Sequence, residues 1–201
     1  MVYLEKRNIQ TLIKKKVILN DMETLKEIYN RYSVTGDNGI GDKGEIHSYI
    51  DEYERLLVPY RHNSNFLEIG INRGHSLKMF AEYFINSNVI GIEIWEGCKA
   101  FFEEYQVPCK LIIADGTKAV YELNDMMFDV VIDDGSHMLN DQIASFNIYS
   151  KKMNKGGIYI IEDIINLDMQ LPEFKKLGDC EVIDNRKLKN RFDDILIVFR
   201  F

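Results

Sequence analysis

The stretch FDVVIDDGSH, residues 128–137, passes from an apolar run into two aspartates, a glycine and a histidine. A second run, GGIYIIED at residues 156–163, also ends in two adjacent acidic residues. Short runs rich in Ile and Val and bounded by glycine are typical of strands that are buried on both faces of a parallel sheet. The two stretches therefore predict strands that each bring carboxylates to the carboxyl end of a sheet.

The same alternation extends through the chain from about residue 65. Such βαβα alternation implies a mostly parallel, doubly wound sheet with helices on both faces. We therefore expect an α/β, Rossmann-like fold. Earlier strands are expected at NFLEIG (65–70), NVIGIEIW (88–95) and CKLIIADG (109–116), and helical spacing covers residues 75–84, 97–105, 118–123 (a short helix) and 141–153.

The two ends of the chain follow a different pattern. CEVIDN (180–185) and DDILIVFRF (193–201) are strand-like and joined by a short polar link, which predicts an antiparallel hairpin that closes the sheet edge. Residues 22–32 and 47–57 have helical spacing with a glycine-rich loop between them. We expect one domain over residues 1–201, with a helical N-terminal cap (1–60) and a Rossmann-like core (61–201).

Composition excludes several classes of function. The 201 residues carry a net charge of −7, and the densest basic run, KKK at Lys14–Lys16, is read as a solvated leader, so nucleic acid is not expected as a partner. No uninterrupted apolar run approaches ~18 residues, so we expect no membrane insertion. Cys98, Cys109 and Cys180 have no paired or zinc-type spacing, which favours reduced thiols and a cytoplasmic protein.

Acidic residues stand at almost every expected strand end, in EIGINRG, EIW, ADG, DDGSH and IED. Ligands of open parallel sheets bind beyond the carboxyl ends of the strands, where the strand order reverses. Ordinary loop polarity explains one or two such acids, but it does not explain five in succession. The pattern therefore favours a binding site at this edge of the sheet.

The acids after the fourth and fifth strands indicate a metal site formed by Asp134, Glu162 and Asp163. Carboxylates that lie close together raise one another's pKa unless a cation neutralises them. Oxygen ligands of this kind suit Mg²⁺, with Mn²⁺ as the alternative ion. Helix capping by one acidic pair is the simpler explanation, because Asp is favoured at N-caps. It does not account for Glu162 and Asp163 together.

His137 follows Asp134 by three residues. An imidazole beside a metal site accepts a proton from a substrate hydroxyl whose pKa the metal lowers. We expect His137 and Asp134 to be the catalytic pair. The other histidines, His47, His62 and His75, are assigned structural roles by default.

The loop from Glu68 to Gly74 has the form E-x-G-x-x-x-G and lacks the G-x-G-x-x-G spacing of a dinucleotide loop. It resembles motif I of the class I S-adenosylmethionine-dependent methyltransferases. The resemblance implies that Glu93 holds the ribose hydroxyls and Asp115 the adenine amine of S-adenosyl-L-methionine, roles that suit carboxylate acceptors. The expected cofactor-binding residues are Lys43, Tyr49, Glu68, Gly70, Asn72, Gly74, Ser76, Glu93, Ile94, Trp95, Asp115, Gly116, Thr117 and Asp133.

DVVIDDGSH followed by GGIYIIED is similar to the metal-dependent sugar O-methyltransferases, the group that contains the mycinamicin and macrocin enzymes. This resemblance implies that Asp134, Glu162 and Asp163 bind Mg²⁺, that His137 is the general base, and that the metal holds two neighbouring sugar hydroxyls. Residues 42–49 are similar to the segment D-K-x-x-x-H-x-Y that closes over the cofactor in this family. The resemblance covers about residues 35–163, and the chain is short for the group.

The expected function is Mg²⁺-dependent methyl transfer from S-adenosyl-L-methionine to a hydroxyl of a 6-deoxyhexose such as rhamnose, in a glycan or glycoside. A catechol-type O-methyltransferase is the alternative enzyme, with Trp95 and Tyr49 forming a flat apolar slot. A non-catalytic cofactor-binding module is the alternative outside the enzymes. The sequence leaves open whether the chain forms a homo-oligomer or belongs to a larger multidomain glycan-assembly protein.

Overall fold

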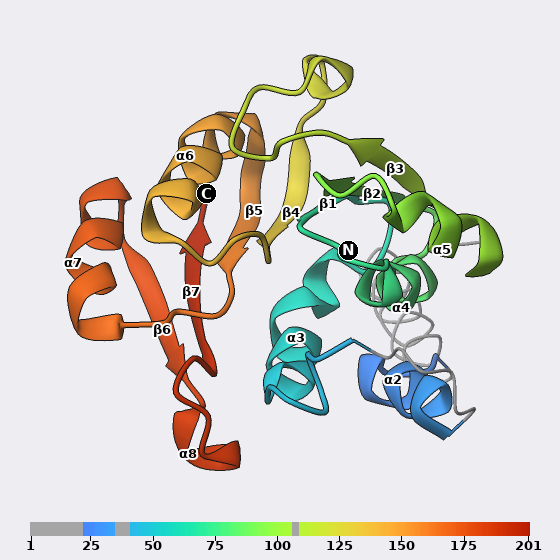
Figure 1. Ribbon diagram of the computed structural model, residues 1–201, viewed down its shortest axis with the longest axis horizontal. Coiled ribbons are helices and arrows are strands. Elements are labelled where there is room, and N and C mark those ends of the chain that lie inside the picture. Colours follow the sequence, from blue (N-terminus) through green and yellow to red (C-terminus); the bar gives the residue numbers. More distant parts are fainter. Residues whose placement is uncertain (1–21, 35–40, 106–108) are drawn as a thin grey trace, which may run out of the picture.

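The computed structural model describes residues 22–34, 41–105 and 109–201. Within these ranges seven strands form one sheet in the order β3-β2-β1-β4-β5-β7-β6 (Figure 1). Only β7 runs antiparallel to its neighbours, β5 and β6. This arrangement confirms the mostly parallel sheet with a C-terminal antiparallel hairpin. The strands are β1 (Asn65–Ile69), β2 (Asn88–Glu93), β3 (Lys110–Ile113), β4 (Phe128–Asp133), β5 (Met153–Ile161), β6 (Cys180–Asp184) and β7 (Ile195–Arg200).

Helices cover both faces of this sheet, as the sequence predicts. Alternate strand residues point to opposite faces, so that Phe66 and Val130 enter one hydrophobic core while Leu67 and Val131 enter the other. Helices α2, α3 and α4 pack into the first core, and α6 and α7 into the second. The helices are α2 (Leu25–Val34), α3 (Tyr49–Leu57), α4 (His75–Tyr83), α5 (Cys98–Tyr105), α6 (Leu139–Tyr149), α7 (Leu167–Leu177) and α8 (Arg186–Lys189), with 3-10 turns η1 (Val58–Tyr60), η2 (Tyr121–Leu123) and η3 (Ser150–Lys152).

Four segments differ in detail from the sequence expectation. The helix expected at 141–153 ends at Tyr149 and is followed by the 3-10 turn η3 and by β5, which begins at Met153. The short helix expected at 118–123 is the 3-10 turn η2, because so short a segment has little to offset the cost of helix nucleation. Helix α7 was not predicted, since Pro172 lies inside it and proline normally interrupts a helical pattern. The polar link between the last two strands contains the four-residue helix α8.

The N-terminal cap packs directly on the core of the sheet. Leu25 of α2 and Tyr53 of α3 belong to the same buried cluster as Phe66 of β1. The expected boundaries of the domain stay a prediction, because residues 1–21, including Lys14–Lys16, lie outside the described residues. Among the described helices, none is both long and apolar enough to cross a membrane.

The strand order reverses between β1 and β4, and this point positions the site. The chain passes from β1 outward to β2 and β3 and then returns to β4 on the other side of β1. Gly70, directly after β1, has φ +80°, and a Cβ on it would lie 2.2 Å from the carbonyl oxygen of Asp134. Only glycine permits this approach. The loops after β1 and β4 therefore meet closely at the switch point, where open α/β sheets bind ligands.

Candidate active site

A cavity of about 620 Å³ opens at this switch point. Its wall is built from the segments that follow β1, β2, β3 and β4, together with Gly41 and Asp42 from the N-terminal region. Several residues expected to bind the cofactor line it: Gly70, Asn72, Ser76, Glu93, Ile94, Asp115, Gly116, Thr117 and Asp133, as do the proposed catalytic residues Asp134 and His137. Lys43, Tyr49, Glu68, Gly74 and Trp95 are not part of this wall.

Glu93, at the end of β2, is held by backbone groups on two sides. Its carboxylate accepts hydrogen bonds from the amides of Asn72, at 2.7 Å, and Trp95, at 2.9 Å. Asn72 adopts the left-handed conformation with φ 50° that lets its amide point at this carboxylate. Each carboxylate oxygen has a further lone pair, so Glu93 is fixed and still able to accept from a ligand. Trp95 stays 47 % exposed beside the cavity.

Asp115, after β3, is fixed by residues next to it in the chain. It is paired with Lys118 at 2.8 Å and accepts from the hydroxyl and amide of Thr117 at 2.6 and 3.0 Å. These contacts, with Lys118 contributing most, lower the pKa of Asp115 to about 2. The side chain is therefore ionised and ready to accept hydrogen bonds from a ligand.

Glu68 lies beneath the β1 loop and is fully buried. It accepts a hydrogen bond from Ser76 Oγ at 2.9 Å, and its Oε1 is 3.3 Å from Lys43 Nζ. Burial raises the pKa of Glu68 to about 7, although Lys43 acts in the opposite direction. In this position Glu68 supports the loop between β1 and α4 from its buried side.

Lys43, one of the expected cofactor-binding residues, is buried among three carboxylates. Its side chain is 1 % exposed, and its Nζ lies 2.5 Å from Asp134 Oδ2 and 2.6 Å from Glu162 Oε1. Burial opposes the charged form, but these carboxylates and Glu68 hold the pKa of Lys43 well above its usual value. The ammonium thus connects Glu68 of β1 to the acids at the ends of β4 and β5.

Asp134, Glu162 and Asp163, which we call the acidic edge, converge around Asp134. Ligand atoms of Asp134, His137 and Asp163 all lie within 4.8 Å of one another. The same holds for Glu68, Asp134 and Glu162. Glu162 therefore lies on the Lys43 side of Asp134, and Asp163 on the His137 side. That these three residues are the metal ligands stays a prediction.

Burial raises the pKa values of all three carboxyl groups of the acidic edge. Burial, followed by the charge of Asp134, raises the pKa of Asp163 to about 7. Burial also raises the pKa of Asp134, against the effect of Lys43, and raises that of Glu162 far above its ordinary value. Carboxylates raised in this way are stabilised when a cation binds beside them. Oxygen ligands in this number suit Mg²⁺ or Mn²⁺.

His137 and Asp163 both have a left-handed backbone conformation. His137 has φ 58° and Asp163 has φ 56°. Such conformations cost about 1–3 kcal/mol each for residues other than glycine, and they concentrate at functional sites. The turn brings His137 Nε2 to 3.8 Å from Asp163 Oδ2. The two turns thus bring the side chains of His137 and Asp163 close together.

Sequence reasoning missed Tyr53, whose hydroxyl donates a hydrogen bond to Glu162 Oε1. Tyr49 donates in the same way to Asp163 Oδ1, at 2.7 Å. The two tyrosines are four residues apart on α3, so they share one face of the helix. The spacing in the sequence indicates the shared face, but only the fold shows that this face meets the acidic edge.

The fold is similar to that of solved methyltransferase structures. No protein-family model matches the chain. Among solved structures, the chain is similar to the MycE methyltransferase from the mycinamycin biosynthetic pathway in complex with Mg and SAH, with TM-score 0.68 and 22% identity over 89% of this chain and 55% of that one. A second structure of MycE, with Mg, SAH and mycinamycin VI, gives TM-score 0.57 and 28% identity over 71% of this chain and 38% of that one.

The chain is also similar in sequence to two curated relatives. The chain is 31% identical over 133 residues to 8-demethyl-8-alpha-L-rhamnosyl tetracenomycin-C 2'-O-methyltransferase of Streptomyces olivaceus, covering 61% of this chain and 35% of the relative. It is 30% identical over 131 residues to demethylmacrocin O-methyltransferase of Streptomyces fradiae, covering 60% and 33%. The chain thus spans about a third of the length of the relatives it matches. The predicted resemblance to the sugar O-methyltransferases is confirmed.

Proposed function

We propose that this chain is an enzyme that transfers the methyl group of S-adenosyl-L-methionine to a sugar hydroxyl with the help of Mg²⁺. One observation carries the proposal: the cavity wall that contains Glu93 and Asp115 also contains Asp134 and His137. Residues suited to holding the cofactor and residues suited to deprotonating an acceptor therefore face one space. The likeness to named sugar O-methyltransferases supports the same conclusion.

Each group has a distinct task in this proposal. Glu93 accepts from the ribose hydroxyls and Asp115 from the adenine amine. Asp134, Glu162 and Asp163 hold Mg²⁺, which supplies positive charge that lowers the pKa of an acceptor hydroxyl. His137 accepts the hydroxyl proton at Nε2, and the neighbouring carboxylate of Asp163 stabilises the imidazolium that forms. Holding donor and acceptor in one cavity aligns them for attack at the methyl carbon.

For the acceptor, we propose a 6-deoxyhexose such as rhamnose with two neighbouring hydroxyl groups. Adjacent oxygens suit the open positions of a Mg²⁺ held by carboxylates. The name of the Streptomyces olivaceus relative contains a rhamnosyl group. Cytoplasmic location, the absence of a nucleic-acid partner and the oligomeric state stay predictions.

The catechol alternative requires a flat apolar slot formed by Trp95 and Tyr49. Neither side chain belongs to the cavity wall. Tyr49 is fully buried, with its ring stacked on that of His47 at a centroid distance of 4.8 Å. Trp95 is exposed beside the cavity. These positions favour the sugar over the catechol.

The experiment that tests the proposal measures methyl transfer from labelled S-adenosylmethionine to a panel of rhamnosides and catechols, each with Mg²⁺ and with EDTA. We expect label on a rhamnoside that disappears with EDTA. Label that survives EDTA would overturn the metal role of the acidic edge. Label on a catechol would show that the acceptor is a catechol and not a sugar. SAH binding without any methyl transfer would favour the non-catalytic module.

A further inference from the structure

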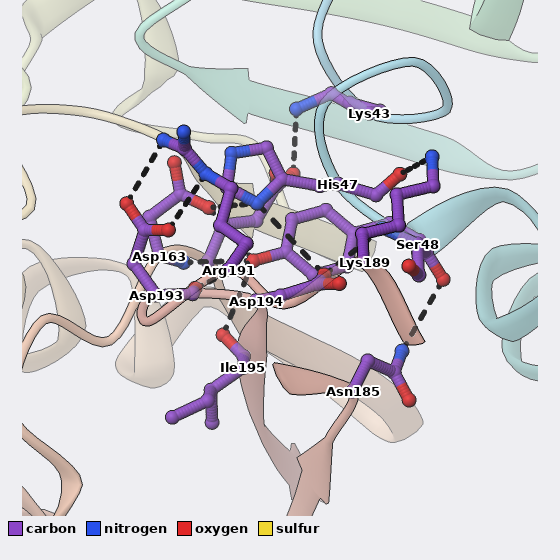
Figure 2. Close-up of polar contacts among 12 residues, drawn as sticks. Lys43, His47, Ser48, Asp163, Asn185, Lys189, Arg191, Asp193, Asp194 and Ile195 are labelled. Atoms are coloured by element: carbon purple, nitrogen blue, oxygen red, sulfur yellow. Dashed lines mark hydrogen bonds and ion pairs between the residues drawn. The ribbon is translucent and has the colours of Figure 1, made fainter. Parts of the chain in front are cut away.

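The connection between β6 and β7, residues 185–194, reaches across to the segment before α3, residues 41–48, which we call the lid segment. Figure 2 shows Lys189, Asn185 and Asp194 of the connection beside His47 and Ser48 of the lid segment. The Nζ of Lys189 donates hydrogen bonds to the carbonyl oxygens of Gly44, of Glu45 at 3.0 Å and of His47 at 2.8 Å. The ammonium of Lys189 therefore donates to three carbonyl oxygens of a single turn.

A second group of contacts fixes Ser48, the last residue of the lid segment. Its amide donates to Asp194 Oδ1 at 2.9 Å, and its carbonyl accepts from Asn185 Nδ2 at 3.2 Å. Asp194 is fully buried and Asn185 is 8 % exposed. The connection thus satisfies both backbone polar groups of Ser48 with buried side chains.

The lid segment in turn reaches both halves of the candidate site. Gly41 and Asp42 line the cavity, and Lys43 binds Asp134 and Glu162. At its other end, His47 is 1 % exposed, and its Nδ1 lies 3.4 Å from Asp163 Oδ1. Displacement of this segment would therefore open the cavity and remove the partners of the acidic edge together.

Apart from the buried ion pairs of Lys43 and the contact of His47 with Asp163, the lid segment has few contacts of its own that could hold it closed. Its described backbone bonds run from Ile46 and His47 to the carbonyl of Asp42, at 3.0 and 2.8 Å, and from Tyr49 to that of Lys43, at 3.0 Å. Ile46, its one large aliphatic side chain, is 46 % exposed. Segments with so few buried apolar contacts open easily unless other parts of the protein hold them.

We propose that Lys189 is a positioning residue that holds the lid segment closed over the cavity, with Asn185 and Asp194 completing the latch. The consequence for cofactor binding rests on the proposed function. Closure itself is a property of the ligand-free protein. Lys189 acts through the lid segment and touches neither the cavity nor the acidic edge.

Hydrogen–deuterium exchange of the ligand-free full chain tests the latch directly. The variant is Lys189→Met, which keeps an unbranched side chain of similar length but removes the ammonium, and the matched control is Lys187→Met in the same turn. We expect Lys189→Met to speed exchange of the Ile46–Tyr49 amides roughly threefold to tenfold, while β4 and β5 exchange as before. Exchange equal to that of Lys187→Met would overturn the proposal.

SAH affinity, measured by calorimetry, tests the positioning role. We expect Lys189→Met to raise the Kd roughly threefold to tenfold, Lys189→Arg to restore it, and kcat at saturating cofactor to change less than KM. Faster exchange without loss of affinity would overturn the positioning role. If the unaltered protein binds no SAH, the proposed function fails, and the exchange of the ligand-free variants still decides whether the latch exists.

Discussion

The two halves of the site hold their acidic side chains by different means. Glu93 and Asp115, beyond β2 and β3, are fixed mostly by neighbouring backbone and side-chain groups such as Trp95 and Thr117. Asp134 and the rest of the acidic edge, beyond β4 and β5, are fixed by Lys43 and by two tyrosines of α3, about a hundred residues away in the chain. The proposed cofactor half is therefore encoded locally, whereas the acidic edge depends on the closure of the N-terminal region.

The largest expected effect is a loss of turnover that leaves cofactor binding unchanged. His137→Ala should lower kcat about 100-fold to 10,000-fold, the usual contribution of a general base, while the Kd for SAH stays unchanged. Initial rates with labelled S-adenosylmethionine and calorimetry with SAH measure the two quantities. Normal turnover in this variant would remove His137 from the role of base.

The second prediction removes the cation that joins the two halves. Lys43→Met should lower the free energy of unfolding by about 3–5 kcal/mol, because it leaves buried carboxylates without their counter-charge. Urea unfolding at neutral pH measures this change. Lys26→Met is the matched control, since its pair with Asp51 is exposed and contributes little. Equal stability of the two variants would show that Lys43 is not the countercation of the acidic edge.

The third prediction uses carboxyl groups of the site whose pKa values are shifted in opposite directions. Glu68, Asp133 and Asp163 have pKa values raised to about 7, so the folded state binds more protons than the unfolded one. Their contribution to stability is full below about pH 4 and is lost as the pH rises to about 7. Asp115, with its pKa lowered to about 2, contributes in the other direction, and its contribution is lost as the pH falls through about 4 towards 2.

We therefore expect the ligand-free protein to lose stability, on the order of a few kcal/mol, between about pH 4.5 and pH 7.5. Millimolar Mg²⁺ should restore part of this loss at the upper end, because the ion compensates the ionised carboxylate of Asp163 and stabilises the folded state by binding to it. Urea unfolding across this pH range, with Mg²⁺ or EDTA, measures both effects. Stability that rises steadily to pH 7.5 without metal would contradict the raised pKa values.

The smallest expected effect concerns the cofactor half alone. Glu93→Gln replaces one carboxylate oxygen, an acceptor, by an amide NH2 group, a donor. SAH should therefore bind about tenfold more weakly, which is a loss of about 1.4 kcal/mol of binding free energy. Mn²⁺ affinity, measured in parallel by electron paramagnetic resonance, should not change. A variant that loses the metal as well would show that the two halves are coupled more tightly than their contacts indicate.

The strands and most helices follow from local patterns. Buried strands need runs of Ile and Val between glycines, and such runs place β1 to β5 close to their predicted positions. Helix α7 escaped prediction because Pro172 interrupts the pattern. Asn166 caps its start in both directions: its Oδ1 accepts from the Met169 amide at 3.2 Å, and its amide donates to Gln170 Oε1 at 2.7 Å. Local propensity does not reveal which proline a helix accommodates.

By itself, the sequence determined which acids stand at the carboxyl edge of the sheet, because the strand period and the glycines are local properties. Only the tertiary structure decided which cations and hydroxyls face those acids. Lys43 meets Asp134 across 91 residues and Glu162 across 119. Lys189 meets the lid segment across more than 140. Pairings at such distances are set by the packing of whole helices and hairpins on the sheet, and no periodicity along the chain records that packing.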